Sequence, residues 1–139
     1  MLRKLSRVMA ALVAIGFMGA IAISANAEDK KDPTAKEIMK HVNAKQDGLI
    51  AKTKALTKDG KWEDAAKVAK ELKDDGEALG KAKPKKGEPD SWKKLTKAYA
   101  ERTAAIATAV DKKDAKEVDA AVKDFTNGKN CMECHSAHK

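Results

Sequence analysis

The last nine residues of the chain hold its only two cysteines and two of its three histidines. Cys131, Cys134 and His135 have the spacing Cys-x-x-Cys-His, which is the attachment pattern for c-type haem. On a helix the two sulfurs lie one turn apart on one side, where they can reach the two vinyl groups of a porphyrin, and the adjacent imidazole projects toward the iron. The sequence therefore predicts one covalent haem c, with His135 as the proximal iron ligand.

Three other uses of the cysteine pair compete with haem attachment. A disulfide bond would be ordinary in an exported protein, but it leaves His135 and the alanine-rich helices unexplained. A thioredoxin-like redox pair stands at the head of a helix that follows a strand, and no strand is expected here. A zinc site would need further ligands, and His138 follows too closely for the usual finger spacing. Haem attachment is the favoured interpretation.

The first 27 residues predict a cleaved signal peptide. Three basic residues precede an apolar run over residues 8–23, and Ala25-Asn26-Ala27 matches the small-x-small pattern of a cleavage site. The apolar run is short for a membrane span and no second one follows, so we expect no stable membrane insertion; an uncleaved N-terminal anchor is the alternative. Residues 28–139 then form a single domain in the periplasm or an equivalent extracytoplasmic compartment.

The exported part carries 26 basic and 21 acidic residues, which gives a net charge of +5. Its lysines alternate with acids, as is typical of solvated helix surfaces. Without a concentrated basic patch or interleaved aromatic residues, we expect no nucleic-acid partner. A modestly basic surface suits redox partner proteins that are acidic, because complementary charge speeds their encounter. The spacing supports no serine–histidine–acid arrangement, so we expect no enzymatic activity.

Alanine, lysine, glutamate and leucine dominate, aromatic residues make up only 4%, and this composition favours helix. Apolar positions repeat in steps of three and four, as on the inward face of a bundle helix. The predicted helices run from Asp32-Pro33 to Asp59-Gly60, from Trp62 to Leu79, from Asp90-Ser91 to Val110, and from a capping box at Asp114 and Glu117 to the C-terminus. Residues 80–90 should form an exposed connection. The predicted fold is an all-α, antiparallel up-down four-helix bundle.

Many of the predicted inward positions are alanine or glycine. Four such helices alone would bury little apolar area per residue, and a haem in the middle would compensate. Gly128, one turn before Cys131, lacks a Cβ, so a flat ring could lie against the backbone there; local helix flexibility is the alternative explanation for this glycine.

With these residues identified, the chain resembles the class II cytochromes c, the group of cytochrome c′ and cytochrome c-556. The resemblance covers nearly all of residues 28–139, and its specific part is Gly128-Lys129-Asn130-Cys131-Met132-Glu133-Cys134-His135 near the C-terminus. It implies a covalent haem assembled outside the cytoplasm, His135 as the proximal ligand and, in many members, a homodimer. The chain departs from the family at His138, where members often have an aromatic residue, and in its sparse aromatic content.

The resemblance leaves the sixth iron ligand open. In c-556-like members a first-helix methionine completes a six-coordinate iron suited to electron transfer, and the matching residue here is Met39, on the predicted inward face. A methionine that only fills the core is the alternative. We therefore expect a carrier of single electrons; the alternative is a five-coordinate c′-like protein that binds NO or CO in gas capture, sensing or detoxification.

Three further side chains could lie near a haem. His41 is roughly 200° around the helix from Met39, so it is expected in solvent. His138 is expected in an exposed tail. Arg102 interrupts the inward face of the third predicted helix, where it could pair with a haem propionate; an arginine at the rim, with its stem on apolar surface, is the favoured alternative.

Overall fold

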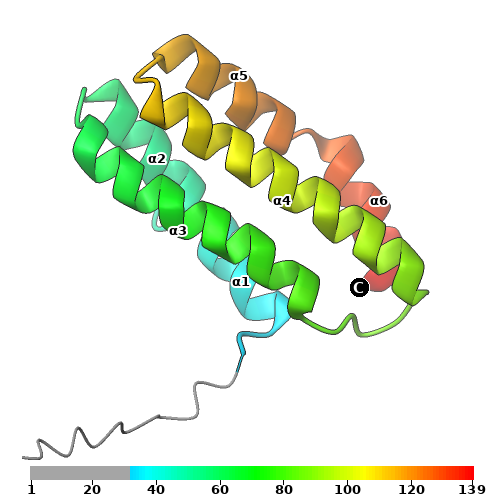
Figure 1. Ribbon diagram of the computed structural model, residues 1–139. Coiled ribbons are helices and arrows are strands. Elements are labelled where there is room, and N and C mark those ends of the chain that lie inside the picture. The colour runs from blue at the N-terminus through cyan, green and yellow to red at the C-terminus, as the bar shows by residue number, and fades with distance from the viewer. Residues whose placement is uncertain (1–31) are drawn as a thin grey trace, which may run out of the picture. The chain divides into compact units, whose positions relative to one another are not determined.

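The computed structural model describes residues 32–139, and the regular structure of these residues is entirely helical. The helices, in chain order, are α1 (Ala35–Asn43), α2 (Leu49–Lys58), α3 (Trp62–Lys81), α4 (Pro89–Asp111), α5 (Ala115–Phe125) and α6 (Gly128–His138) (Figure 1). The all-α prediction is confirmed. The predicted signal peptide, residues 1–27, lies outside the described residues. Within residues 32–139, no helix has both the length and the apolar character that crossing a membrane requires.

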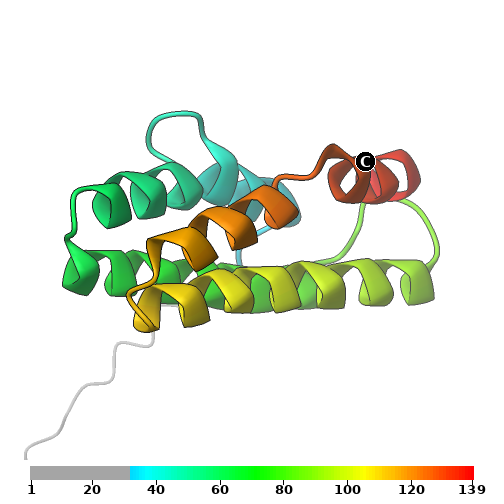
Figure 2. The same ribbon diagram turned by 90° about the horizontal axis from the view of Figure 1, so that it is seen from above.

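The two longest helices, α3 and α4, run antiparallel and pack along each other (Figures 1 and 2). Helix α2 packs on α3, α5 packs on α4, and α2 also contacts α5. Helix α1 contacts α2 and α3, whereas α6 contacts α4. As a result, α1 and α6, which carry the candidate iron ligands, both lie against the α3–α4 pair.

The contact between α3 and α4 is made largely of small side chains. Gly76 of α3 lies directly against Thr103 of α4, and Gly80 lies near Thr96. Both threonines are buried. The hydroxyl of Thr96 donates to the carbonyl of Trp92, and that of Thr103 donates to the carbonyl of Ala100, both at 2.9 Å. Both buried threonine hydroxyls at this contact therefore have a hydrogen-bond partner within α4.

Larger aliphatic side chains fill the rest of the core. They come from the first five helices and include Ile38, Val42, Leu49, Leu72, Leu79, Ile106, Val110, Val118 and Val122. Helix α6 differs, because its only buried residue is His138. The position of α6 is therefore not fixed by an apolar face of its own.

The predicted first helix is two helices in the structure. It begins later than expected because Thr34, not Asp32, is the N-cap: the Thr34 side chain accepts from Glu37 N–H at 3.3 Å, and the Glu37 carboxylate accepts from Thr34 N–H at 2.8 Å. Helix α1 ends at Asn43, and the chain folds back before α2. Gly48 permits this turn, since a Cβ there would lie 2.6 Å from the backbone nitrogen of Ala44.

The predicted last helix is also divided. Asp114 caps α5 as expected, accepting from the N–H groups of Lys116 and Glu117 at 2.9 and 3.1 Å. The reciprocal half of the capping box is replaced by an ion pair, in which the Glu117 carboxylate binds Lys112 Nζ at 2.9 Å. Helix α5 ends at Phe125, and the side chain of Asn127 caps α6 by accepting from Lys129 N–H at 3.1 Å. The break lets α6 take its own direction (Figure 2).

Substitution of Gly76 by alanine should destabilise the fold. The new Cβ would lie 3.0 Å from Thr103 Cβ and 3.1 Å from Thr103 Cγ2, which forces α3 and α4 apart. We expect a loss of about 1–3 kcal/mol in the free energy of unfolding, measured by urea denaturation. Gly80→Ala is the matched control, because its Cβ would meet Thr96 Oγ1 at an ordinary 3.6 Å. That variant should be unchanged or more stable by up to about 1 kcal/mol. Equal losses in both variants would contradict the close contact at Gly76.

Candidate cofactor site

A cavity of about 570 Å³ lies among α1, α3, α4, α6 and the end of α5. Its volume falls within the range of pockets that hold small molecules and cofactors. The lining residues are Met39, Asn43, Leu79, Lys94, Leu95, Ala98, Tyr99, Arg102, Phe125, Asn130, Cys131, Glu133, Cys134 and His135. Apolar side chains of α3, α4 and α5 therefore face the cysteine pair and the histidine of α6.

Five of the six residues singled out from the sequence line this one cavity. Met39 comes from α1, Arg102 from α4, and Cys131, Cys134 and His135 from α6. The sixth, Gly128, is the first residue of α6 and does not line the cavity. A Cβ at Gly128 would meet no atom within 4 Å, so the space beside it is open.

The cysteines are not joined by a disulfide. Cys131 is exposed and Cys134 is half-buried. Burial raises the pKa of the Cys134 thiol, and the neighbouring Cys131 and Glu133 raise it further. The raised pKa keeps the Cys134 thiol protonated near neutral pH.

Met39 is half-buried at the cavity wall, held in place by the buried neighbours Ile38 and Val42 on α1. Its carbonyl oxygen accepts from Asn43 Nδ2 at 3.2 Å, and its sulfur lies 3.7 Å from the same nitrogen. His41 does not line the cavity: it is exposed, and its Nδ1 lies 2.6 Å from Asp75 Oδ2. The prediction that His41 lies off the inward face is confirmed.

Two aromatic rings that were not among the predicted site residues form part of the cavity wall. Tyr99 and Phe125 pack edge to face, with centroids 5.0 Å apart and an interplanar angle of 63°. The Tyr99 hydroxyl is buried and makes no hydrogen bond of good geometry among residues 32–139, although the Asn43 side chain lies close enough to lower its pKa. Burial raises the pKa of this phenol, so it is neutral. An unsatisfied buried hydroxyl costs about 1–3 kcal/mol, and an occupant of the cavity that offers an acceptor would remove that cost.

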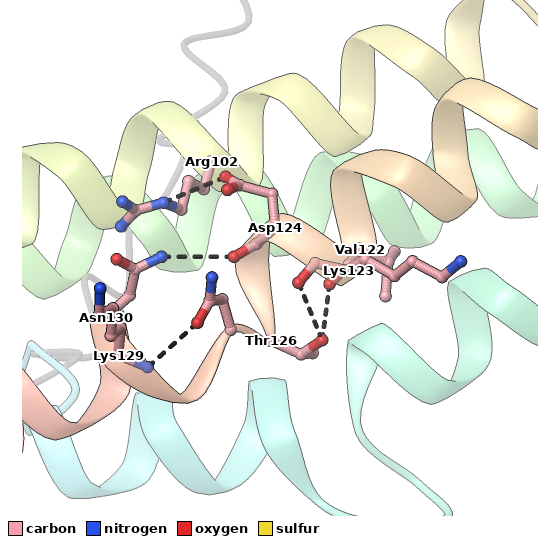
Figure 3. Close-up of polar contacts among 8 residues, drawn as sticks. Arg102, Val122, Lys123, Asp124, Thr126, Lys129 and Asn130 are labelled. Atoms are coloured by element: carbon pink, nitrogen blue, oxygen red, sulfur yellow. Dashed lines mark hydrogen bonds and ion pairs between the residues drawn. The ribbon is translucent and has the colours of Figure 1, made fainter.

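Arg102 stands at the cavity wall and also joins α4 to the break between α5 and α6. Its Nε lies 3.3 Å from Asp124 Oδ2, and the Asp124 carbonyl accepts from Asn130 Nδ2 at 3.3 Å (Figure 3). The Thr126 hydroxyl donates to the Val122 carbonyl at 2.8 Å. These contacts fix the start of α6 just before Cys131. Arg102 therefore has an ion-pair partner within the protein.

The expectation of an exposed His138 is wrong. The residue is 4% exposed, its Nδ1 lies 3.0 Å from the carbonyl oxygen of Lys86, and its Nε2 lies 3.0 Å from Ser91 Oγ. Because a carbonyl only accepts, Nδ1 carries the proton and Nε2 accepts from the serine hydroxyl. The ring packs edge-on against Trp92, with centroids 5.3 Å apart. We call these contacts the His138 anchor.

The connection between α3 and α4 is shaped to receive the anchor. Gly87 has a φ of +90°, and a Cβ there would lie 2.7 Å from His138 Cε1 and 2.5 Å from the Ala137 carbonyl oxygen. Trp92 Nε1 donates to the Ala82 carbonyl at 2.8 Å and so closes the same connection. Sequence reasoning missed the anchor because its partners lie 47 and 52 residues away in the chain. Local spacing near the C-terminus carries no signal for such a contact.

Comparisons of the chain with protein-family models, with curated proteins and with solved structures find no match. The cavity has an apolar wall, two cysteines and a histidine on one helix, and an unsatisfied hydroxyl. No group of three His, Cys, Asp or Glu side chains within residues 32–139 could hold a metal ion by itself. A porphyrin supplies four nitrogen donors of its own, so this donor set suits a haem.

Removal of the His138 side chain should loosen α6. His138→Ala removes two hydrogen bonds and the contact with Trp92, so we expect a loss of about 2–4 kcal/mol in the free energy of unfolding. Faster amide hydrogen exchange should be concentrated in α6. The matched control, His41→Ala, removes an exposed pair and should cost no more than about 1 kcal/mol. If the two variants lost the same stability, the anchor would not hold α6.

Proposed function

We propose that this protein is an extracytoplasmic, single-haem c-type cytochrome of the class II kind, which carries single electrons between redox partner proteins. One observation carries the proposal: Cys131, Cys134, His135 and Met39 line the same cavity, although one of them comes from the opposite end of the described chain. In this assignment α1 and α2 together correspond to the first helix of the family's antiparallel bundle, and α5 and α6 together correspond to the fourth. Helices α3 and α4 correspond to the second and third.

The residues divide the work of holding the cofactor. When bound, haem supplies an iron that gains and loses one electron. Cys131 and Cys134 would attach the ring through thioethers, and His135 would ligate the iron. Met39 would supply a second protein ligand to the iron, because it lines the same cavity from α1 rather than α6. A thioether ligand favours the reduced iron and so raises the reduction potential.

The chain also controls the surroundings of the cofactor. Leu79, Leu95 and Phe125 give the cavity apolar walls that exclude water. The neutral Tyr99 phenol adds no charge to these walls. The cavity is open at α6, where Cys131 and His135 are exposed. An electron could therefore leave at this edge, while the inner wall keeps the iron in a low-dielectric environment.

One contact favours the second candidate, a five-coordinate protein that binds NO or CO. The Met39 sulfur lies 3.7 Å from Asn43 Nδ2, so the amide can hold the thioether at the wall. If the amide kept that contact in the loaded protein, Met39 would not bind the iron, and a small gas could bind there instead. The two candidate functions therefore differ in whether the Met39 sulfur binds the iron or stays against the Asn43 amide.

Covalent haem attachment is tested by mass spectrometry. The full chain, expressed with a c-type maturation system, should be recovered as residues 28–139 with the added mass of one haem. Cys131→Ser with Cys134→Ser should abolish the covalent adduct, whereas Met132→Ser, inside the motif but 71% exposed, should keep it. A wild-type protein without haem, or with the two cysteines bridged in its active form, would refute the proposed function.

The sixth ligand is tested by optical and EPR spectra of the loaded protein. If Met39 ligates, the ferric protein should be low-spin with a sulfur-to-iron charge-transfer band. Met39→Ala should convert it to high-spin and remove the band. Met132→Ala is the control and should change neither. A wild-type protein that is high-spin and binds CO readily would select the gas-binding candidate instead.

A further inference from the structure

Positive charge is distributed unevenly over the described chain. Residues 32–139 contain 24 basic and 19 acidic residues. Residues 81–97, which we call the basic segment, contain seven lysines and only two acids, Glu88 and Asp90. The excess of basic over acidic residues in the basic segment therefore equals the excess in residues 32–139 as a whole. The other described residues contain equal numbers of basic and acidic side chains.

The lysines of the basic segment are also uncompensated. Elsewhere on α3, Lys67 pairs with Asp64 at 3.3 Å and Lys70 pairs with Asp74 at 2.6 Å. The basic segment is different: within the part of the chain that the structure describes, none of its lysines forms an ion pair, and all are exposed. They are Lys81, Lys83, Lys85, Lys86, Lys93, Lys94 and Lys97. Their charges project into solvent and are available to a partner.

The basic segment lies at the end of the molecule where the cavity opens. Lys94 lines the cavity itself. The carbonyl of Lys86 receives the His138 anchor, which holds the connection between α3 and α4 against the C-terminal end of α6. Figures 1 and 2 both show this connection and α6 at the same end. The uncompensated lysines therefore flank the helix that carries Cys131, Cys134 and His135.

We propose that the basic segment is the docking face for an acidic redox partner protein, which exchanges electrons with this chain at the mouth of the cavity. This inference rests on the proposed function and names the surface that it uses. Complementary charge steers encounters and orients transient partners without requiring a large apolar interface. One electron passes from the reduced protein to the oxidised partner, and no bond forms or breaks.

The exposed side chains favour a protein partner over a membrane or a nucleic acid. Within the described residues Met132 is the one large hydrophobic side chain that is exposed, so the basic segment offers no apolar anchor for a bilayer. None of the described aromatic side chains is exposed, so none can stack on bases. An acidic protein face needs only the charges.

Charge reversal provides the kinetic test. The patch variant is Lys83→Glu, Lys85→Glu and Lys93→Glu, because these three side chains neither line the cavity nor contact His138. The control variant is Lys52→Glu, Lys54→Glu and Lys58→Glu on α2, with the same change in net charge. Lys58, at the end of α2 next to the start of α3, lies about 30 Å along α3 from Lys81, and Lys52 lies about 9 Å closer because α2 packs back along α3. Both variants are compared with the wild type as haem-loaded protein.

Stopped-flow oxidation by hexacyanoferrate(III), an anion, and by tris(phenanthroline)cobalt(III), a cation, reports the charge at the exchange site. At about 0.1 M ionic strength the screening length is about 10 Å, so distant charges contribute little. The patch variant should react at least about fivefold more slowly with the anion and faster with the cation, and the control variant should change less than about twofold. A patch variant with wild-type rates overturns the docking face.

A binding measurement tests the partner class without relying on electron transfer. Plastocyanin, an acidic copper protein, is titrated into isotope-labelled protein, and backbone amide shifts are followed by NMR. Shifts confined to residues 81–97 and α6, weakened by salt and lost in the patch variant, support the proposal. Shifts elsewhere, or tight binding of the wild type to phosphatidylserine vesicles with no response to plastocyanin, overturn it. A protein that fails to acquire haem refutes the proposed function instead, and the two failures are thereby distinguished.

Discussion

The structure depends on holding α6 in place without an apolar face of its own. Every other helix buries aliphatic or aromatic side chains in the shared core, whereas α6 buries only His138. Polar contacts replace the missing hydrophobic contribution: the Asp124–Asn130 hydrogen bond fixes the start of α6, and the His138 anchor fixes its end. Between these two points Cys134 packs against the core, and the two cysteines and His135 line the cavity.

The opposite wall of the cavity depends on the close contact of α3 and α4. Gly76 and Thr103 let the two helices approach, and Leu79 and Tyr99, each one turn away from this contact, line the cavity. The approach leaves the Tyr99 hydroxyl buried and unsatisfied among the described residues. Such a cost is tolerated where a site is shaped for an occupant, since the surrounding fold stabilises the arrangement. The cavity therefore has one wall of closely packed helices, α3 and α4, and a second wall, α6, that polar contacts hold at its two ends.

The charged side chains are also distributed differently near the cavity and away from it. The helix surfaces away from the cavity pair lysines with acids at intervals of three and four residues, which stabilises helices but attracts no partner. At the end that carries α6, the basic segment has seven lysines and two acids, and none of these lysines forms an ion pair within residues 32–139. The His138 anchor links the two features, because it ties the basic connection to the helix that would carry the cofactor. One polar contact therefore brings together the surface charge and the site that it would serve.

The sequence by itself determined the helical class, the cap at Asp114 and the inward placement of Met39, because these follow from residue periodicity and hydrogen bonds within a few residues. It also singled out Cys131, Cys134 and His135 by their spacing. Only the tertiary structure decided that the first and last predicted helices are broken, that Arg102 binds Asp124, and that His138 is buried. The contacts of Arg102 and His138 join residues 22, 47 and 52 positions apart, and no local pattern of residue types encodes such a contact. The two breaks lie at local features, Gly48 and the Asn127 cap, but only the folded chain shows that they end the helices.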